Sequence, residues 1–171
     1  MITMPPESGI VFSFPKDWNP LKFDKCVPYI ERIMPLQNAC AVDFLCCCGN
    51  RLIFVEVMRF KEKLLDDYSE LANKISSQIK DTICGLAIFH LINDPTMEMY
   101  AQALFAQSPA GDKHKIIAFL EIENFSTKIA PETVKANVLS QLKQRFVPLG
   151  FAVRVLDSHN IAKSPMKAEL Q

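Results

Sequence analysis

The sequence lacks a surplus of either charge, a long hydrophobic run and an N-terminal signal segment. Lys and Arg together number 19, as do Asp and Glu, so the formal net charge is zero. A balanced charge gives no overall attraction to nucleic acid, although a local basic patch remains compatible with it. Charged residues interrupt every apolar stretch before it reaches the roughly 18 residues of a membrane span, and the N-terminus has no basic region followed by an apolar one. We therefore expect a cytoplasmic protein without a membrane partner.

The common signatures of zinc, redox and nucleotide chemistry are also missing. None of the six cysteines lies in a CxxC spacing, and three of them are consecutive, at positions 46–48. Consecutive residues of a strand point to opposite faces, so these three thiols cannot all face one ligand. The GxSxG, HExxH, Walker A and GxGxxG motifs do not occur. We interpret the cysteines as reduced, buried thiols that act as small hydrophobic side chains.

The chain does contain enough apolar material for one hydrophobic core. Of its 171 residues, 49% are hydrophobic and 22% are charged, which is typical of a folded domain and not of a disordered chain. The length suits a single domain. We expect residues 1–158 to form one α/β domain and residues 159–171 to form a polar, flexible C-terminal tail.

The order of apolar patterns predicts alternating helices and strands. Helical spacing is expected over residues 21–34, where Pro28 would shorten or kink the helix, and again over residues 61–92 and 131–146. Short apolar runs predict strands over residues 10–14, 40–48, 51–60, 116–122 and 151–156. This alternation favours an α/β fold with a mixed central β-sheet flanked by helices.

The clearest local signal is a β-hairpin around Gly49 and Asn50. These two residue types tolerate the positive φ of a tight turn, and an apolar run stands on either side of them. Because both runs are almost continuously apolar, we expect strands that are buried on both faces. A two-residue turn places Asp43 directly opposite Glu56 on the same face, with Cβ atoms about 5 Å apart. A slip of one residue would put the two acids on opposite faces.

Two facing carboxylates between apolar strands need some form of neutralisation. At about 5 Å and an effective dielectric near 20 they repel by roughly 3 kcal/mol, and desolvation adds to this cost. Three arrangements relieve the repulsion: one carboxyl group stays protonated, a Lys or Arg lies beside the pair, or a divalent cation bridges it. Mg²⁺ favours one or two carboxylates together with water and phosphate oxygens. The residues leave these three alternatives open.

The place of this acid pair within the chain is informative. Asp43 lies in the first hairpin strand and Glu56 in the second, with a helix predicted before the hairpin and a long helix, a strand, a helix and a strand after it. This arrangement resembles the PD-(D/E)XK nuclease-like superfamily, over about residues 21–156. The resemblance implies a restriction-endonuclease-like fold and metal-dependent hydrolysis of phosphodiester bonds in DNA or RNA. It also implies Mg²⁺ or Mn²⁺ held by Asp43 and Glu56, with Glu31 of the first predicted helix as a further ligand.

The sequence departs from that family at one important position. The family carries a lysine two residues after the second acid, where this chain has Met58, which can neither carry charge nor orient a water molecule. Within the resemblance, Lys74 or Lys80 on the long predicted helix, or Lys61 just beyond the strand, would supply the missing catalytic ammonium group. Each lysine by itself is more typical of a solvated helix face.

Three hypotheses therefore stay open. The first is a metal-dependent nuclease with a relocated lysine and a nucleic-acid substrate. The second is a catalytically inactive descendant of that fold, acting through protein partners or as a homodimer, which Met58 and the neutral charge favour. The third is an unrelated small α/β protein, because fold resemblance alone does not establish chemistry.

Overall fold

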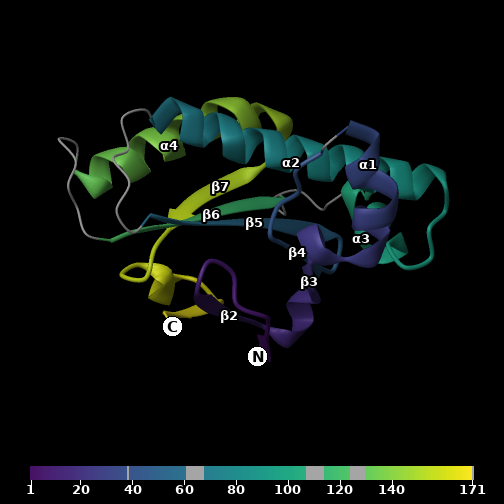
Figure 1. Ribbon diagram of the computed structural model, residues 1–171, viewed down its shortest axis with the longest axis horizontal. Helices are drawn as coiled ribbons and strands as arrows, with labels where there is room; N and C mark the ends of the chain where they lie inside the picture. The colour runs from purple at the N-terminus through teal and green to yellow at the C-terminus, as the bar shows by residue number, and fades with distance from the viewer. Residues whose placement is uncertain (38, 61–67, 107–113, 124–129, 171) are drawn as a thin grey trace.

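The computed structural model describes residues 1–37, 39–60, 68–106, 114–123 and 130–170. A mixed sheet of five strands lies at its centre, in the order β3-β4-β5-β6-β7 (Figure 1). β3, β4 and β5 pair antiparallel, whereas β5, β6 and β7 run parallel to one another. The strands are β3 (Pro20–Lys22), β4 (Phe44–Cys48), β5 (Arg51–Phe60), β6 (Lys115–Ile122) and β7 (Ala152–Leu156). The mixed central sheet predicted from the sequence is therefore confirmed.

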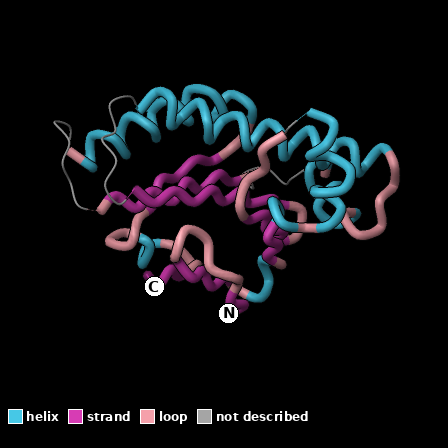
Figure 2. The backbone as a smooth tube through the Cα atoms, viewed as in Figure 1, coloured by secondary structure: helices cyan, strands magenta, loops and turns pink. Residues whose placement is uncertain are grey.

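Helices cover one face of this sheet (Figure 2). The three longest are α2 (Tyr68–Leu91), α3 (Glu98–Phe105) and α4 (Pro131–Phe146). α2 packs against the sheet through apolar residues three or four apart, among them Leu71, Ile75 and Ile79. α4 begins at Pro131, where a missing N–H does no harm because the first helical turn leaves its N–H groups unpaired. None of the described helices is long and apolar enough to cross a membrane.

A second, smaller sheet covers the other face, in the order β1-β2-β8. Its strands are β1 (Ile2–Thr3), β2 (Ile10–Phe14) and β8 (Lys167–Leu170). Aromatic rings join the two sheets: Phe12 lies 5.1 Å from Phe119, and Phe14 lies 5.4 Å from Phe44, between ring centroids. The chain is thus an α/β protein whose central strands are buried on both faces, by helices on one side and by a small sheet on the other.

The C-terminal residues, for which the sequence predicted a flexible tail, form the short helix η5 (Ile161–Lys163) and then β8. β8 pairs antiparallel with β2, with Ile10 opposite Leu170. Figure 1 shows that both ends of the chain consequently lie on the same side of the central sheet. Two further short helical turns are η1 (Lys16–Trp18) and η4 (Val147–Leu149).

The segment before β4 differs from the helix predicted over residues 21–34. Its first residues form β3, with Leu21 opposite Leu45 of β4. The chain becomes regularly helical only after Pro28, which is better suited to a helix start than to a helix interior. The elements of this segment are η2 (Phe23–Lys25), the π-helical η3 (Tyr29–Ile33) and α1 (Met34–Gln37). The first half of the predicted helix is therefore wrong. Of the long helix predicted over residues 61–92, residues 61–67 lie outside the described residues and most of the remainder forms α2.

The β4–β5 hairpin has the predicted two-residue turn. Cys48 pairs with Arg51 across it, and Gly49 takes a φ of +58°. A positive φ at the first turn position alone is the pattern of a type II′ turn, whose twist matches that of the two strands. The turn therefore fixes the register of the whole hairpin.

Candidate functional site

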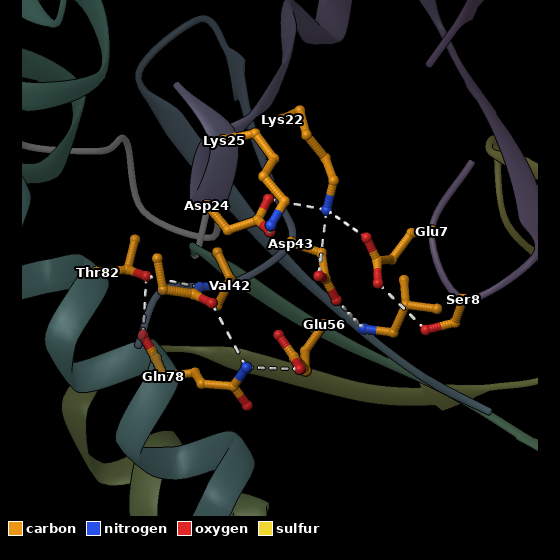
Figure 3. Close-up of polar contacts among 12 residues, drawn as sticks. Glu7, Ser8, Lys22, Asp24, Lys25, Val42, Asp43, Glu56, Gln78 and Thr82 are labelled. Carbon is orange, nitrogen blue, oxygen red and sulfur yellow. Dashed lines mark hydrogen bonds and ion pairs between the residues drawn. The ribbon is translucent and has the colours of Figure 1, made fainter. Parts of the chain in front are cut away.

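Asp43 and Glu56 lie opposite each other at the start of β4. Phe44 pairs with Val55, so the next pair in the register joins Asp43 to Glu56. The side chain of Glu56 projects toward the face that α2 covers, where it contacts Gln78, whereas the carboxylate of Asp43 points toward Lys22 and the backbone N–H of Val57 (Figure 3). Asp43 is 8% exposed and Glu56 is 3% exposed. The structure thus has the hairpin register that the sequence predicted for the acid pair, with the two carboxyl groups turned to different partners.

The carboxylate of Asp43 has a partner on each oxygen. Its Oδ2 accepts a hydrogen bond of 2.8 Å from the backbone N–H of Val57, and its Oδ1 lies 3.2 Å from Nζ of Lys22. Because β4 begins only at Phe44, the N–H of Val57 lies beyond the end of the strand ladder, and the carboxylate supplies the missing acceptor. Burial raises the pKa of Asp43, and the charge of Lys22 and the Val57 N–H offset part of that rise.

Lys22 of β3 joins Asp43 to two further acids. Its Nζ lies 2.7 Å from Oε2 of Glu7 and 2.8 Å from Oδ1 of Asp24 (Figure 3). Burial alone lowers the pKa of Lys22, but the charge of Asp43 and the hydrogen bonds to Asp24 and Glu7 outweigh burial and raise it. Lys22 is therefore an ammonium group throughout the physiological pH range. The three acids offer oxygens that lie within 4.8 Å of one another, a spacing that suits one shared cation.

Glu7 reaches this cluster from the turn before β2. Ser8 and Gly9 take positive φ values of 53° and 72°, and Arg59 donates hydrogen bonds to both of their carbonyl groups. The positive φ at position 9 favours glycine, and a Cβ there would lie 2.6 Å from Nη1 of Arg59 and displace the end of that side chain. Glu7 and Lys22 also line a surface groove of about 540 Å³.

Glu56 has an incomplete set of partners. Its Oε1 accepts a hydrogen bond of 2.7 Å from Nε2 of Gln78, whereas its Oε2 is buried and has no hydrogen-bond partner among the described residues. Figure 3 shows this second oxygen turned away from Gln78, toward the part of the site that holds Asp43. Burial and the charge of Asp43 raise the pKa of Glu56 more than the Gln78 hydrogen bond, the charge of Lys74 and the backbone N–H of Asp43 lower it. Lys22 thus compensates the charge of Asp43, while the raised pKa of Glu56 favours its protonated form.

Three side chains of α2 hold the backbone that leads into Asp43. The Oγ1 of Thr82 accepts a 3.0 Å hydrogen bond from the Val42 N–H and donates one of 2.8 Å to the carbonyl of Gln78. Oδ2 of Asp81 accepts a bond of 3.1 Å from the N–H of Cys40, and Nε2 of Gln78 donates one of 3.4 Å to the carbonyl of Ala41. Residues 40–42 lie outside any strand, so these bonds replace the ladder contacts that they lack.

The remaining residues predicted for the site lie at different distances from it. Lys74 is exposed on α2, one helical turn before Gln78, and its charge acts on Glu56. Lys80 is also exposed, but two residues after Gln78 on a helix it points to a different side. Glu31 is exposed on η3, and the acidic cluster found among the described residues does not include it. Lys61 lies outside the described residues.

Sequence reasoning missed two groups that touch the acid pair. Lys22 falls within the helix predicted over residues 21–34, because β3 is too short to show a strand pattern. Gln78 went unnoticed inside an apolar helix, although a polar residue between Ile75 and Ile79 on the buried stripe is a signal that could have been used. The polar Thr82, four residues after Gln78, extends the same signal.

Comparisons of this chain with protein-family models, with curated proteins and with solved structures found no match.

Proposed function

We propose that this chain is a nuclease-like phosphodiester hydrolase whose metal site is built on Asp43 and Glu56. The observation that carries the proposal is Oε2 of Glu56, a buried carboxylate oxygen without a hydrogen-bond partner among the described residues, placed beside a second acid. A buried polar atom left without a partner costs about 1–3 kcal/mol. A divalent cation between the two carboxylates would remove that cost and would explain an acid pair inside an apolar hairpin.

The side chains present suit a hard divalent cation. Asp43 and Glu56 would hold Mg²⁺ or Mn²⁺ through carboxylate oxygens, the ligands that these ions prefer. Gln78 would act as the residue that orients Glu56, since its Nε2 already donates to Oε1. When bound, the ion would polarise a phosphodiester group and lower the pKa of a water molecule. Glu56 must lose its proton to bind, so metal affinity is expected to rise with pH.

The order of elements supports a restriction-endonuclease-like fold. The helical segment η3–α1 precedes the β4–β5 hairpin, and α2, β6, α4 and β7 follow it, in the succession that the resemblance implies. Glu56 lies on β5, the middle strand of the five, where a side chain is farthest from either edge of the sheet. The additional elements are α3, β3 and the small second sheet.

Lys74 is the residue that we assign to the role that Met58 cannot fill. Its ammonium group is exposed to solvent on the side of α2 that carries Gln78, and its charge already acts on Glu56. A group in that position would attract the phosphate of DNA or RNA toward the acid pair. Lys80 has no comparable relationship to Glu56.

The test is thermal unfolding during titration with Mn²⁺ and Mg²⁺ at pH 8, followed by cleavage assays on DNA and RNA. A ligand that binds only the folded state adds about 2.7 kcal/mol at a hundredfold excess over its Kd, which is roughly 5–10 °C in Tm for a chain of this size. We expect this rise in the wild-type protein and its loss in Asp43→Asn and in Glu56→Gln.

Glu31→Gln is the matched control for this titration. Glu31 is an exposed acid outside the acidic cluster, so its variant should keep the full metal-dependent rise. Metal-dependent cleavage that disappears in Glu56→Gln would complete the case. A folded wild-type protein whose Tm responds to neither ion would contradict the proposal.

A second candidate function is that of a catalytically inactive module of the same fold, acting through protein partners or as a homodimer. Two observations favour it. Lys22 already supplies a positive charge to Asp43, and Met58 is 6% exposed within the core beneath the helices, so the family's lysine position holds no polar group. An inactive module predicts no metal-dependent rise in Tm and no cleavage, and the titration therefore separates the two functions.

A further inference from the structure

Lys22 occupies a place that a metal ion often takes in an acidic site. Its ammonium group is surrounded by carboxylates from three separate segments: Glu7 before β2, Asp24 in η2 and Asp43 before β4. The Lys22 side chain is only 11% exposed, and its Nζ lies 4.7 Å from the centre of the Phe44 ring, whose face attracts a cation. The ammonium group donates a hydrogen bond to Asp43 and forms close ion pairs with Glu7 and Asp24.

One positive charge does not balance the acids that meet here. Lys22 offsets one of the three carboxylates around it, the exposed Lys25 pairs with Asp24 at 3.5 Å, and Glu56 stands on the far side of Asp43 as a fourth acid. An independent observation marks where a further cation would bind, because Oε2 of Glu56 is buried, lacks a hydrogen-bond partner among the described residues and is turned toward the Asp43 side of the site (Figure 3). The centre therefore has two positions for positive charge, and Lys22 fills one of them.

We propose that Lys22 is a built-in cation that replaces one of two metal ions, so that this protein binds a single divalent ion, between Asp43 and Glu56. The identity of that single ion rests on the proposed function, whereas the role of Lys22 rests on its own three ion pairs. Lys22 excludes any other cation from the oxygens of Glu7 and Asp24 for as long as its ammonium group stays in place. Removing its charge should open that position to a second ion.

Counting bound Mn²⁺ ions per chain tests this inference. Equilibrium dialysis at pH 8 would compare the wild-type protein with Lys22→Met, because methionine keeps most of the apolar length of lysine and removes its charge. We expect one ion in the wild type and two in Lys22→Met. Lys25→Met is the matched control: the Lys25 side chain is 71% exposed and its ion pair with Asp24 is 3.5 Å long, so this variant should keep one ion.

The outcomes separate this inference from the proposed function. One possible result is that the wild type binds no Mn²⁺ and Lys22→Met binds one ion, which is lost again in the double variant Lys22→Met, Asp24→Asn. This result would support Lys22 as the built-in cation and would reject the metal site at Glu56. An equal number of ions in the wild type and in folded Lys22→Met overturns the inference, whatever that number is. If Lys22→Met does not fold without metal, the unfolded variant is refolded in the presence of Mn²⁺ and the yield of folded protein is measured. Recovery of folded protein supports the inference, and failure to recover overturns it.

Discussion

The carboxylate of Asp43 accepts a hydrogen bond of 2.8 Å from the backbone N–H of Val57, the residue that follows Glu56. This bond ties the acid at the start of β4 to the strand that carries the second acid. The donor belongs to the backbone of a buried central strand, so it does not depend on the rotamer of any other side chain. The carboxylate of Asp43 therefore keeps a fixed position relative to β5 before any ligand binds, and such preorganisation is what a binding site requires.

Replacing Glu56 with Gln should stabilise the metal-free protein at alkaline pH. Burial and the charge of Asp43 raise the pKa of Glu56 from 4.5 to about 9 in the folded state. Because folding raises this pKa, the contribution of Glu56 to the free energy of unfolding is fully present below pH 4.5. Between pH 4.5 and 9 the unfolded chain loses the proton while the folded protein keeps it, so this contribution is lost as the pH rises. Glu56→Gln removes the titration, so urea unfolding should show a gain of up to about 5 kcal/mol at pH 8, at 1.36 kcal/mol for each pKa unit above 4.5, and little change at pH 4.

Glu121→Gln provides the comparison for that experiment. Glu121 is also buried in the central sheet, but both of its oxygens accept hydrogen bonds from Ser158, at 2.9 and 3.0 Å. Converting one acceptor into a donor should therefore lower stability by about 1 kcal/mol at pH 8 and leave it no higher at pH 4. A Glu56→Gln variant that is less stable than the wild type at pH 8 would show that Glu56 is ionised and fully compensated in the folded protein.

Removing the hydroxyl of Thr82 should loosen the segment that leads into Asp43. Thr82→Val keeps the shape of the side chain but leaves the buried N–H of Val42 without its acceptor, which should cost about 1–3 kcal/mol in urea unfolding. Metal affinity should fall as well, because residues 40–42 set the position of Asp43. Thr82→Ser retains the hydroxyl and should restore most of the affinity. Unchanged metal binding in a folded Thr82→Val would mean that the Val57 contact alone positions Asp43.

The two lysines of α2 that the sequence offered should differ in their effect on the site. The charge of Lys74 lowers the pKa of Glu56, so Lys74→Met should raise that pKa further and shift metal binding to higher pH. Lys80→Met changes a charge of equal size on another side of the helix and should leave the pH dependence of Mn²⁺ binding as in the wild type. Where cleavage is measurable, Lys74→Met should lower it by about 10²-fold or more, a typical contribution of one catalytic group. Equal pH profiles for the two variants would remove Lys74 from the site.

Local patterns were sufficient for the elements nearest the acid pair. Gly49 and Asn50 predicted the turn because only a few residue types accept its backbone angles, and the turn then set the register of β4 and β5. The long amphipathic stripe of α2 and the proline at the start of α4 were equally readable. By contrast, β3 has three residues and β8 is mostly polar, so neither shows a strand pattern. Both are strands because of backbone hydrogen bonds to distant partners, and a sequence does not display such bonds.

The sequence by itself predicted that Asp43 lies opposite Glu56, because a two-residue turn at Gly49 and Asn50 sets that register. It left open which of three ways would neutralise them. Only the tertiary structure decided that Lys22 pairs with Asp43 while Gln78 meets Glu56, since these contacts join segments 21 and 22 residues apart in the chain. Charge compensation inside a protein depends on distance in space and on burial, and both are properties of the packed fold.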